Sequence, residues 1–81
     1  MIYATVVGDD NTITINLSDG TKISGDLFDA SEEGSLESWC INEQIIQDVE
    51  PVYDVESLRE LAELYFQTVN KQVEIISCTW G

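Results

Sequence analysis

Carboxylates are the residues of this sequence whose number and spacing could do chemistry. The 81 residues include 16 Asp and Glu against three Lys and Arg, which gives a formal net charge of −13. Paired carboxylates can act as general acid and base, or bind Ca²⁺ through their oxygens. Most of them lie in one stretch in which Arg59 is the only cation: Asp26, Asp29, Glu32, Glu33, Glu37, Glu43, Asp48, Glu50, Asp54, Glu56, Glu60 and Glu63.

Enzyme chemistry and metal binding are not predicted. The chain has no His, the commonest general base and metal ligand. With so many acids, close pairs arise by chance, and the spacing of a calcium-binding EF-hand loop is absent. Cys40 and Cys78 make an incomplete zinc site and have no adjacent basic cluster that would activate a thiolate. The glycines form no phosphate-binding loop. We therefore expect no catalytic residue, no metal site and no cofactor.

A stripe of glutamates on a predicted helix is the best-defined candidate binding surface. Asp54 is a suitable N-cap, and apolar residues recur over positions 55–69 with the period of an amphipathic helix. At 100° per residue, three carboxylates gather on the opposite side: Glu56, Glu60 and Glu63. A solvated helix face usually mixes lysines with its glutamates, whereas this one has only Arg59. We expect this stripe to contact a partner.

A second group of acids precedes that helix: Asp26, Asp29, Glu32, Glu33 and Glu37. Helix N-termini explain some of these carboxylates, but five exceed what capping needs. Tyr53 is a candidate aromatic anchor for the same partner, because aromatic side chains dominate binding energy at interfaces. Trp39 and Trp80 are expected in the core.

The excess of acid predicts a basic protein partner. Net negative charge works against direct binding to nucleic acid or to an anionic membrane. It speeds association with a cationic patch instead. A groove built for nucleic acid would meet carboxylates where it accepts phosphates. Halophilic adaptation would produce the same excess of acid, and so would selection for ordinary solubility.

Alternating apolar and polar residues predict three antiparallel strands in the first third of the chain. In the first hairpin we place Val6 opposite Ile13. In the second hairpin, a three-residue loop ending in Gly20 places Ile15 opposite Ile23. Both registers keep the aliphatic side chains on one face of the sheet.

The middle of the chain is predicted to be helical over residues 35–47, because Leu36 and Trp39 have helical spacing. Glu43 would project onto the apolar side of that helix, so residues 44–49 are left open between irregular structure and a short strand. The β-branched run at 73–80 is read as the last strand.

The predicted fold is a single α+β domain over residues 1–81. It has a four-stranded, mostly antiparallel sheet with two helices packed on one face, in the order βββααβ. The N-terminal residues lack a basic leader, and no apolar run approaches the length of a membrane span, so we expect a cytoplasmic protein.

The passage from Phe28 to Trp39 resembles the strand-to-helix passage of some small phage-encoded anti-CRISPR proteins. The string Leu36-Glu37-Ser38-Trp39, which follows a hairpin around Asp19-Gly20-Thr21-Lys22, carries the likeness. Taken with the charge, the resemblance implies a non-enzymatic inhibitor that acts as a DNA mimic on the nucleic-acid-binding surface of a CRISPR effector.

Our hypothesis is thus a bacteriophage anti-defence protein whose carboxylates imitate phosphates on a host nuclease complex. An immunity or antitoxin protein that neutralises a basic toxin is an alternative from another class. A virion assembly protein that uses its sheet edge is a third. The oligomeric state is not predicted.

Overall fold

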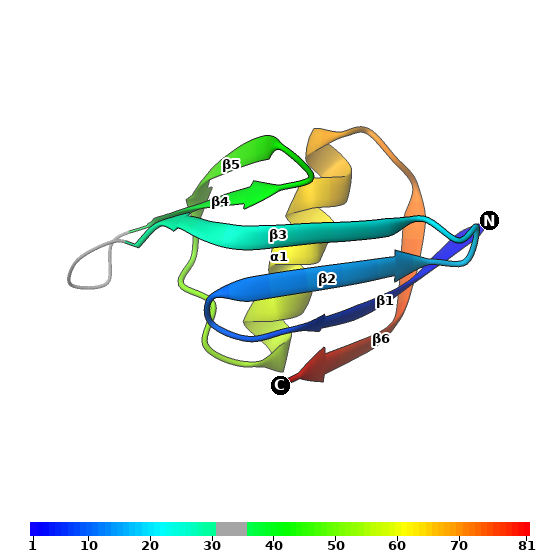
Figure 1. The fold of residues 1–81 in the computed structure, drawn as a ribbon, viewed down its shortest axis with the longest axis horizontal. Coiled ribbons are helices and arrows are strands. Elements are labelled where there is room, and N and C mark those ends of the chain that lie inside the picture. The colour runs from blue at the N-terminus through cyan, green and yellow to red at the C-terminus, as the bar shows by residue number, and fades with distance from the viewer. Residues whose placement is uncertain (31–35) are drawn as a thin grey trace.

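A mixed sheet of six strands with a helix on one face makes up the fold (Figure 1). The structure is a computed structural model that describes residues 1–30 and 36–81. In chain order its elements are β1 (Ile2–Gly8), β2 (Thr12–Leu17), β3 (Lys22–Asp29), β4 (Glu37–Ile41), β5 (Gln44–Val49), α1 (Val55–Thr68) and β6 (Val73–Trp80).

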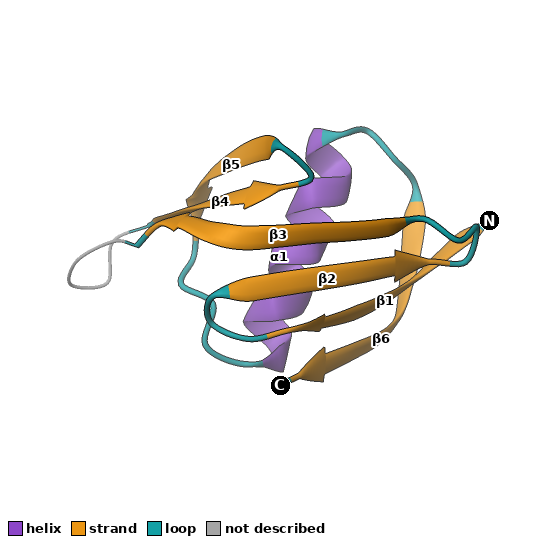
Figure 2. Cartoon of the chain, in the orientation of Figure 1, coloured by secondary structure: helices purple, strands orange, loops and turns teal. Residues whose placement is uncertain are grey.

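The strand order is β5-β4-β3-β2-β1-β6, so the first strand is internal and the last one lies at an edge. Neighbouring strands are antiparallel except β1 and β6, which are parallel. Two parallel strands need a crossover connection between them. Here the chain passes through β2 to β5 after β1, and α1 then leads across the sheet to β6. Figure 2 shows α1 crossing behind the sheet between β5, at one edge, and β6, at the other.

The predicted helix over residues 35–47 is wrong, and so is the predicted fold of four strands and two helices in the order βββααβ. From residue 37 onward this segment is an antiparallel hairpin of β4 and β5. Its turn residues Asn42 and Glu43 have φ of 52° and 65°, as a two-residue type I′ turn requires. Trp39 and Ile41 alternate toward the core with a strand period. The string that carries the anti-CRISPR resemblance therefore leads into a strand.

The two N-terminal hairpins differ in how well the sequence predicts their registers. In the first, Val6 pairs with Ile15, two residues from the predicted partner. The faces are preserved because the shift is even. Asp9 shapes the observed loop, since its Oδ1 accepts hydrogen bonds from the Asn11 and Thr12 amides, both at 2.8 Å. The second hairpin is confirmed, because Ile15 pairs with Ile23.

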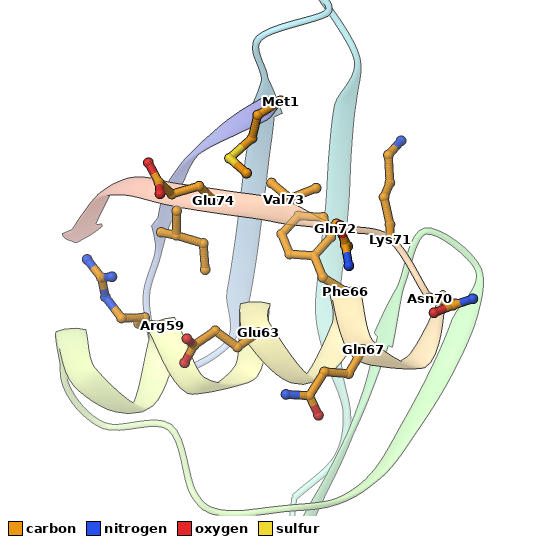
Figure 3. A pocket seen from close by; sticks show the side chains of 11 residues that line it. Met1, Arg59, Glu63, Phe66, Gln67, Asn70, Lys71, Gln72, Val73 and Glu74 are labelled. Atoms are coloured by element: carbon orange, nitrogen blue, oxygen red, sulfur yellow. The ribbon is translucent and has the colours of Figure 1, made fainter.

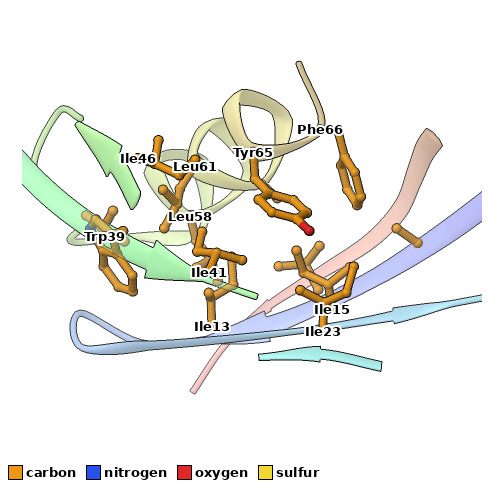
Figure 4. Close-up of a cluster of buried hydrophobic side chains, with 14 of the residues drawn as sticks. Ile13, Ile15, Ile23, Trp39, Ile41, Ile46, Leu58, Leu61, Tyr65 and Phe66 are labelled. Atoms are coloured by element: carbon orange, nitrogen blue, oxygen red, sulfur yellow. The ribbon is translucent and has the colours of Figure 1, made fainter. Parts of the chain in front are cut away.

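The core lies between α1 and one face of the sheet (Figure 4). Leu58, Leu61 and Tyr65 of α1 are buried over Ile13, Ile15 and Ile41 of the strands. Trp39 is fully buried, as expected for a core position. The opposite face of the sheet includes a set of hydroxyl side chains: Thr5, Thr12, Thr14, Ser24, Ser38, Ser77 and Thr79.

Both edge strands contain a β-bulge. In β5, Ile46 pairs with Trp39 and Val49 pairs with Glu37, so β5 has one more residue in this interval than β4. The left-handed φ of 60° at Asp48 makes the bulge, and both Ile46 and Val49 are buried although they are three residues apart. In β6 the extra residue is Ile76, which is 60% exposed.

Candidate protein-binding surface

The glutamate stripe is present on α1, as the sequence predicts. Glu56, Glu60 and Glu63 are all exposed. Residues on the other side of the helix are buried against the sheet, among them Leu58 and Leu61. This burial holds the three carboxylates on the outer side of α1, because rotation of the helix about its axis would expose the core.

A capping box fixes the start of α1. The Ser57 amide donates to Asp54 Oδ1 at 2.9 Å, and the Asp54 amide donates to Ser57 Oγ at 3.0 Å. The Ser57 amide and then the Ser57 hydroxyl hold the pKa of the Asp54 carboxyl below its usual value. Asp54 is therefore a structural acid, and the sequence predicts its role correctly.

The structure adds two acids that the sequence does not assign to a site. Asp48, Glu50 and Glu60 line one crevice of about 170 Å³ between the end of β5 and α1. Both Asp48 and Glu50 are exposed. We call the set Asp48, Glu50, Glu56, Glu60 and Glu63 the acidic face. Asp48 and Glu50 come close to α1 only because β4 and β5 form a hairpin. The sequence predicts a helix in place of most of this hairpin, so it does not assign these two acids to the site.

The other flank of α1 has a different character (Figure 3). A groove of about 600 Å³ runs between α1 and β6 and has apolar side chains from Phe66, Val73 and Ile75. Arg59 and Lys71 line it together with Glu63 and Glu74. Two cations and two carboxylates cancel, so this groove is neutral in a protein of net charge −13.

The acids predicted as a second group do not join the acidic face. Asp26 follows Gly25, which faces the core, so its side chain points to the sheet face opposite α1. Asp29 is exposed at the end of β3. Glu32 and Glu33 lie outside the described residues.

Glu37 has a structural position. It is only partly exposed, and its Oε1 accepts long hydrogen bonds from Trp39 Nε1 at 3.4 Å and from the Val52 amide at 3.3 Å. These contacts connect β4 to the segment that leads into α1. Tyr53, in that segment, is 72% exposed and is available to a partner beside the start of α1.

Two further aspartates stabilise turns. Hydrogen bonds from the Asn11 and Thr12 amides lower the pKa of Asp9, and one from the Thr21 amide lowers the pKa of Asp19. Each carboxylate accepts backbone N–H groups that the turn leaves unpaired. These acids contribute to the fold of their loops and are not candidates for partner binding.

Nucleophilic and metal chemistry has little support in the described residues. Cys40 and Cys78 are free and partly buried. Burial raises the pKa of the Cys78 thiol, which lowers its reactivity, and its Sγ lies 3.6 Å from the Val55 carbonyl oxygen. Across residues 1–30 and 36–81, no three His, Cys, Asp or Glu side chains are grouped as metal ligands.

Comparison with known proteins gives no relative. No protein-family model, curated protein or solved structure matches this chain. In the described part of the chain, the one helix is too short and too polar to cross a membrane. The fold and the surface therefore define the protein only as an α+β domain with a charged helix face.

Proposed function

We propose that this protein is a non-enzymatic inhibitor of the phage anti-CRISPR type, whose acidic face occupies the nucleic-acid-binding site of a host effector or nuclease complex. The observation that carries the proposal is the exposed row of Glu56, Glu60 and Glu63, with Asp48 and Glu50 beside it. Glu63 borders the neutral groove, and the other four carboxylates extend away from it over α1 and the end of β5.

The spacing of the row suits a site that accepts phosphates. Glu56 and Glu63 are seven residues apart, which is ~10 Å along a helix at about 1.5 Å per residue. This length corresponds to about three phosphate steps along one strand of a duplex, at about 3.4 Å each. A lysine- or arginine-lined groove that binds a phosphate backbone would meet three carboxylates over this length, at a wider spacing than the phosphates that they replace.

Rigidity makes the row suitable for binding. Its helix is capped by Asp54 and Ser57 and is anchored over the sheet by buried side chains. A surface that is already ordered loses little conformational entropy when a partner binds. Charge complementarity would raise the association rate, and salt would lower it through screening. Tyr53 offers an exposed aromatic side chain at the start of the same helix.

The test is inhibition of DNA binding by purified CRISPR effector–guide complexes, measured by the fluorescence anisotropy of a labelled target duplex. A parallel capture from host bacterial lysate would identify the complex that is bound. We expect the wild-type protein to release the duplex at low salt and to lose this effect at high salt. The double variant Glu56→Lys/Glu60→Lys should inhibit at least about 10-fold less, because it reverses two charges at the centre of the acidic face.

A matched control separates the acidic face from total charge. Asp10→Lys/Glu74→Lys changes the net charge by the same amount at two positions outside the acidic face. It should inhibit nearly as well as the wild type. Equal inhibition by both double variants would overturn the assignment of the acidic face. Capture of a basic toxin, with no effect on any effector complex, would overturn the anti-CRISPR function and support an immunity protein.

A further inference from the structure

The outer edge of β6 has few features that would block an added strand. β6 pairs with β1 on one side and, among the described residues, with no strand on the other. Its eight residues are mostly β-branched or aromatic and contain one charge, Glu74. A long edge of this kind offers unpaired N–H and C=O groups to an added strand unless charges, prolines or bulges block it, and β6 has one bulge, at Ile76.

The spacing of side chains along β6 is symmetric about the peptide between Ile76 and Ser77. The residues that pair with helix-facing positions of β1 are Val73, Ile75, Cys78 and Trp80. In an antiparallel pair of two β6 strands with a twofold axis at that peptide, Val73 opposes Trp80 of the second copy, and Ile75 opposes Cys78 of the second copy. All eight residues then pair, and helix-facing side chains meet only helix-facing ones, as a continuous sheet requires.

This arrangement also extends the neutral groove. The groove is bordered by Val73 at the start of β6, together with Phe66 of α1 (Figure 3). Trp80 of the second copy would lie opposite Val73, at this end of the groove. The predicted core position of Trp80 is wrong, because this side chain is 37% exposed in the single chain, and pairing would give it apolar cover. Glu74 would face Thr79 of the second copy, so the pairing sets no like charges opposite each other.

The strand order keeps part of the acidic face away from this edge. Each copy has a net charge of −13, but β5, with the neighbouring Asp48 and Glu50, is at the far edge of the sheet. Five strand spacings at about 4.8 Å separate the two edges by ~24 Å. That distance is about three Debye lengths at physiological salt. Arg59 and Lys71 offset Glu63 and Glu74 in the groove beside β6.

We propose that β6 is a self-association edge, at which two copies of this chain join their sheets through antiparallel β6 strands. The dimer is independent of the partner that the acidic face binds. Asp48 and Glu50 of each acidic face lie at the β5 edges, which are the far ends of the joined sheet. Because screening reduces the repulsion between copies, dimerisation strengthens with salt. Binding of a basic partner by the acidic face weakens with salt, so the two interactions have opposite salt dependences.

Sedimentation velocity over a range of protein and NaCl concentrations tests the proposal. We expect a species of twice the 9.1 kDa chain mass, favoured by high protein and high salt. Ile76→Lys should raise the dissociation constant at least about 10-fold, since it places the two lysines of the dimer close to each other beside the twofold axis, where like charges oppose the strand pairing. The matched control is Ile45→Lys, which makes the same change on the other edge strand at a residue that is 45% exposed. It should dimerise like the wild type.

Cysteine cross-linking tests the register and does not rely on the Ile76 variant remaining folded. In a Cys40→Ser/Cys78→Ser background, Glu74→Cys/Thr79→Cys should form a disulfide-linked dimer on oxidation. The two positions are too far apart within one extended strand to join each other. Glu74→Cys alone and Thr79→Cys alone should cross-link much less, because this register places neither position close to the same position of the second copy.

Any of the following results would overturn the proposal: a monomer under all conditions, an Ile76→Lys variant as dimeric as the Ile45→Lys control, or equal cross-linking by the single-cysteine and double-cysteine variants. A complex that forms only with an added protein and never between copies would also overturn it. None of these results bears on inhibition of a nuclease, which the anisotropy assay measures separately.

Discussion

The two edges of the sheet have opposite chemical character. At the β5 edge, Asp48 occupies a bulge in the left-handed region, and Glu50 follows it. At the β6 edge the bulge residue is Ile76, and the adjoining groove contains two of the three cations of the chain. A β-bulge therefore carries a carboxylate at one edge and an exposed aliphatic side chain at the other.

This difference shows how a small domain can concentrate charge without preventing every apolar contact. The charge of −13 opposes compaction and association, but its effect falls with distance because salt screens it. Acids lie at one edge, and cations that compensate nearby acids lie at the other, so the two edges can take part in different interactions. Substitutions at each edge test this difference, from the largest expected effect to the smallest.

Loss of a buried side chain should destabilise the β5 edge more than the β6 edge. Ile46 is only 3% exposed, whereas Ile75 is partly buried. We expect Ile46→Ala to lower the free energy of unfolding by about 3 kcal/mol, and Ile75→Ala by about half as much. Urea denaturation in dilute, low-salt solution, where self-association is weakest, measures both. Equal losses would mean that the two edges are attached to the core equally well.

Removal of the α1 cap should have an intermediate effect. Asp54→Ala is expected to lower the melting temperature by about 5 °C, because the Ser57 amide loses its acceptor. Asp54→Asn keeps an acceptor oxygen and should retain most of that stability near neutral pH. Circular dichroism melts check both variants. A large loss in Asp54→Asn would contradict a role based on hydrogen bonding.

The same cap has a defined pH dependence. The pKa of Asp54 is lower in the folded protein than in the unfolded chain. Its charge-dependent contribution is therefore present above the ordinary aspartate value of about 3.9 and is lost as pH falls through the lower folded-state pKa. The melting temperatures of wild type and Asp54→Asn should differ by a constant amount near neutral pH, and that difference should shrink in acid. A difference that grows in acid would contradict the lowered pKa.

The smallest effect should separate the two flanks of α1. Glu60 lines the crevice with Asp48 and Glu50, so Glu60→Gln should relieve repulsion and raise the melting temperature by about 2 °C at low salt. Glu63 lines the groove with Arg59, so Glu63→Gln should give no gain. High salt should remove the difference between them. A protein that folded only in molar salt would indicate halophilic adaptation instead.

The sequence predicts those parts of the fold that have strong local signals. A long apolar period that follows Asp54 predicts α1, and Gly20 predicts the β2–β3 hairpin, since its φ of 94° suits the left-handed position in that loop. The stripe on α1 is predictable for the same reason, because the buried side of a helix fixes the direction of the exposed side.

The parts that the sequence does not predict depend on tertiary context. Asn42-Glu43 is an uncommon pair for a type I′ turn, in which glycine usually takes the second position, so the β4–β5 hairpin has no clear turn signal. The bulge at Asp48 sets Ile46 and Val49 three residues apart, a spacing that is typical of a helix. No local pattern places β6 beside β1, or brings the end of β5 to the side of α1.

The parallel pairing of β1 with β6 has a consequence for the order of folding. Ile2 pairs with Val73, so these contacts join residues separated by most of the chain. Closing such a long loop lowers the conformational entropy of the chain before the β1–β6 contacts can form and stabilise it, which slows folding. During synthesis, β1 and β2 can form their hairpin early, but the other edge of β1 stays unpaired until β6 leaves the ribosome. Over that interval the nascent chain exposes a bare strand edge at β1, where premature association with another chain would compete with native folding.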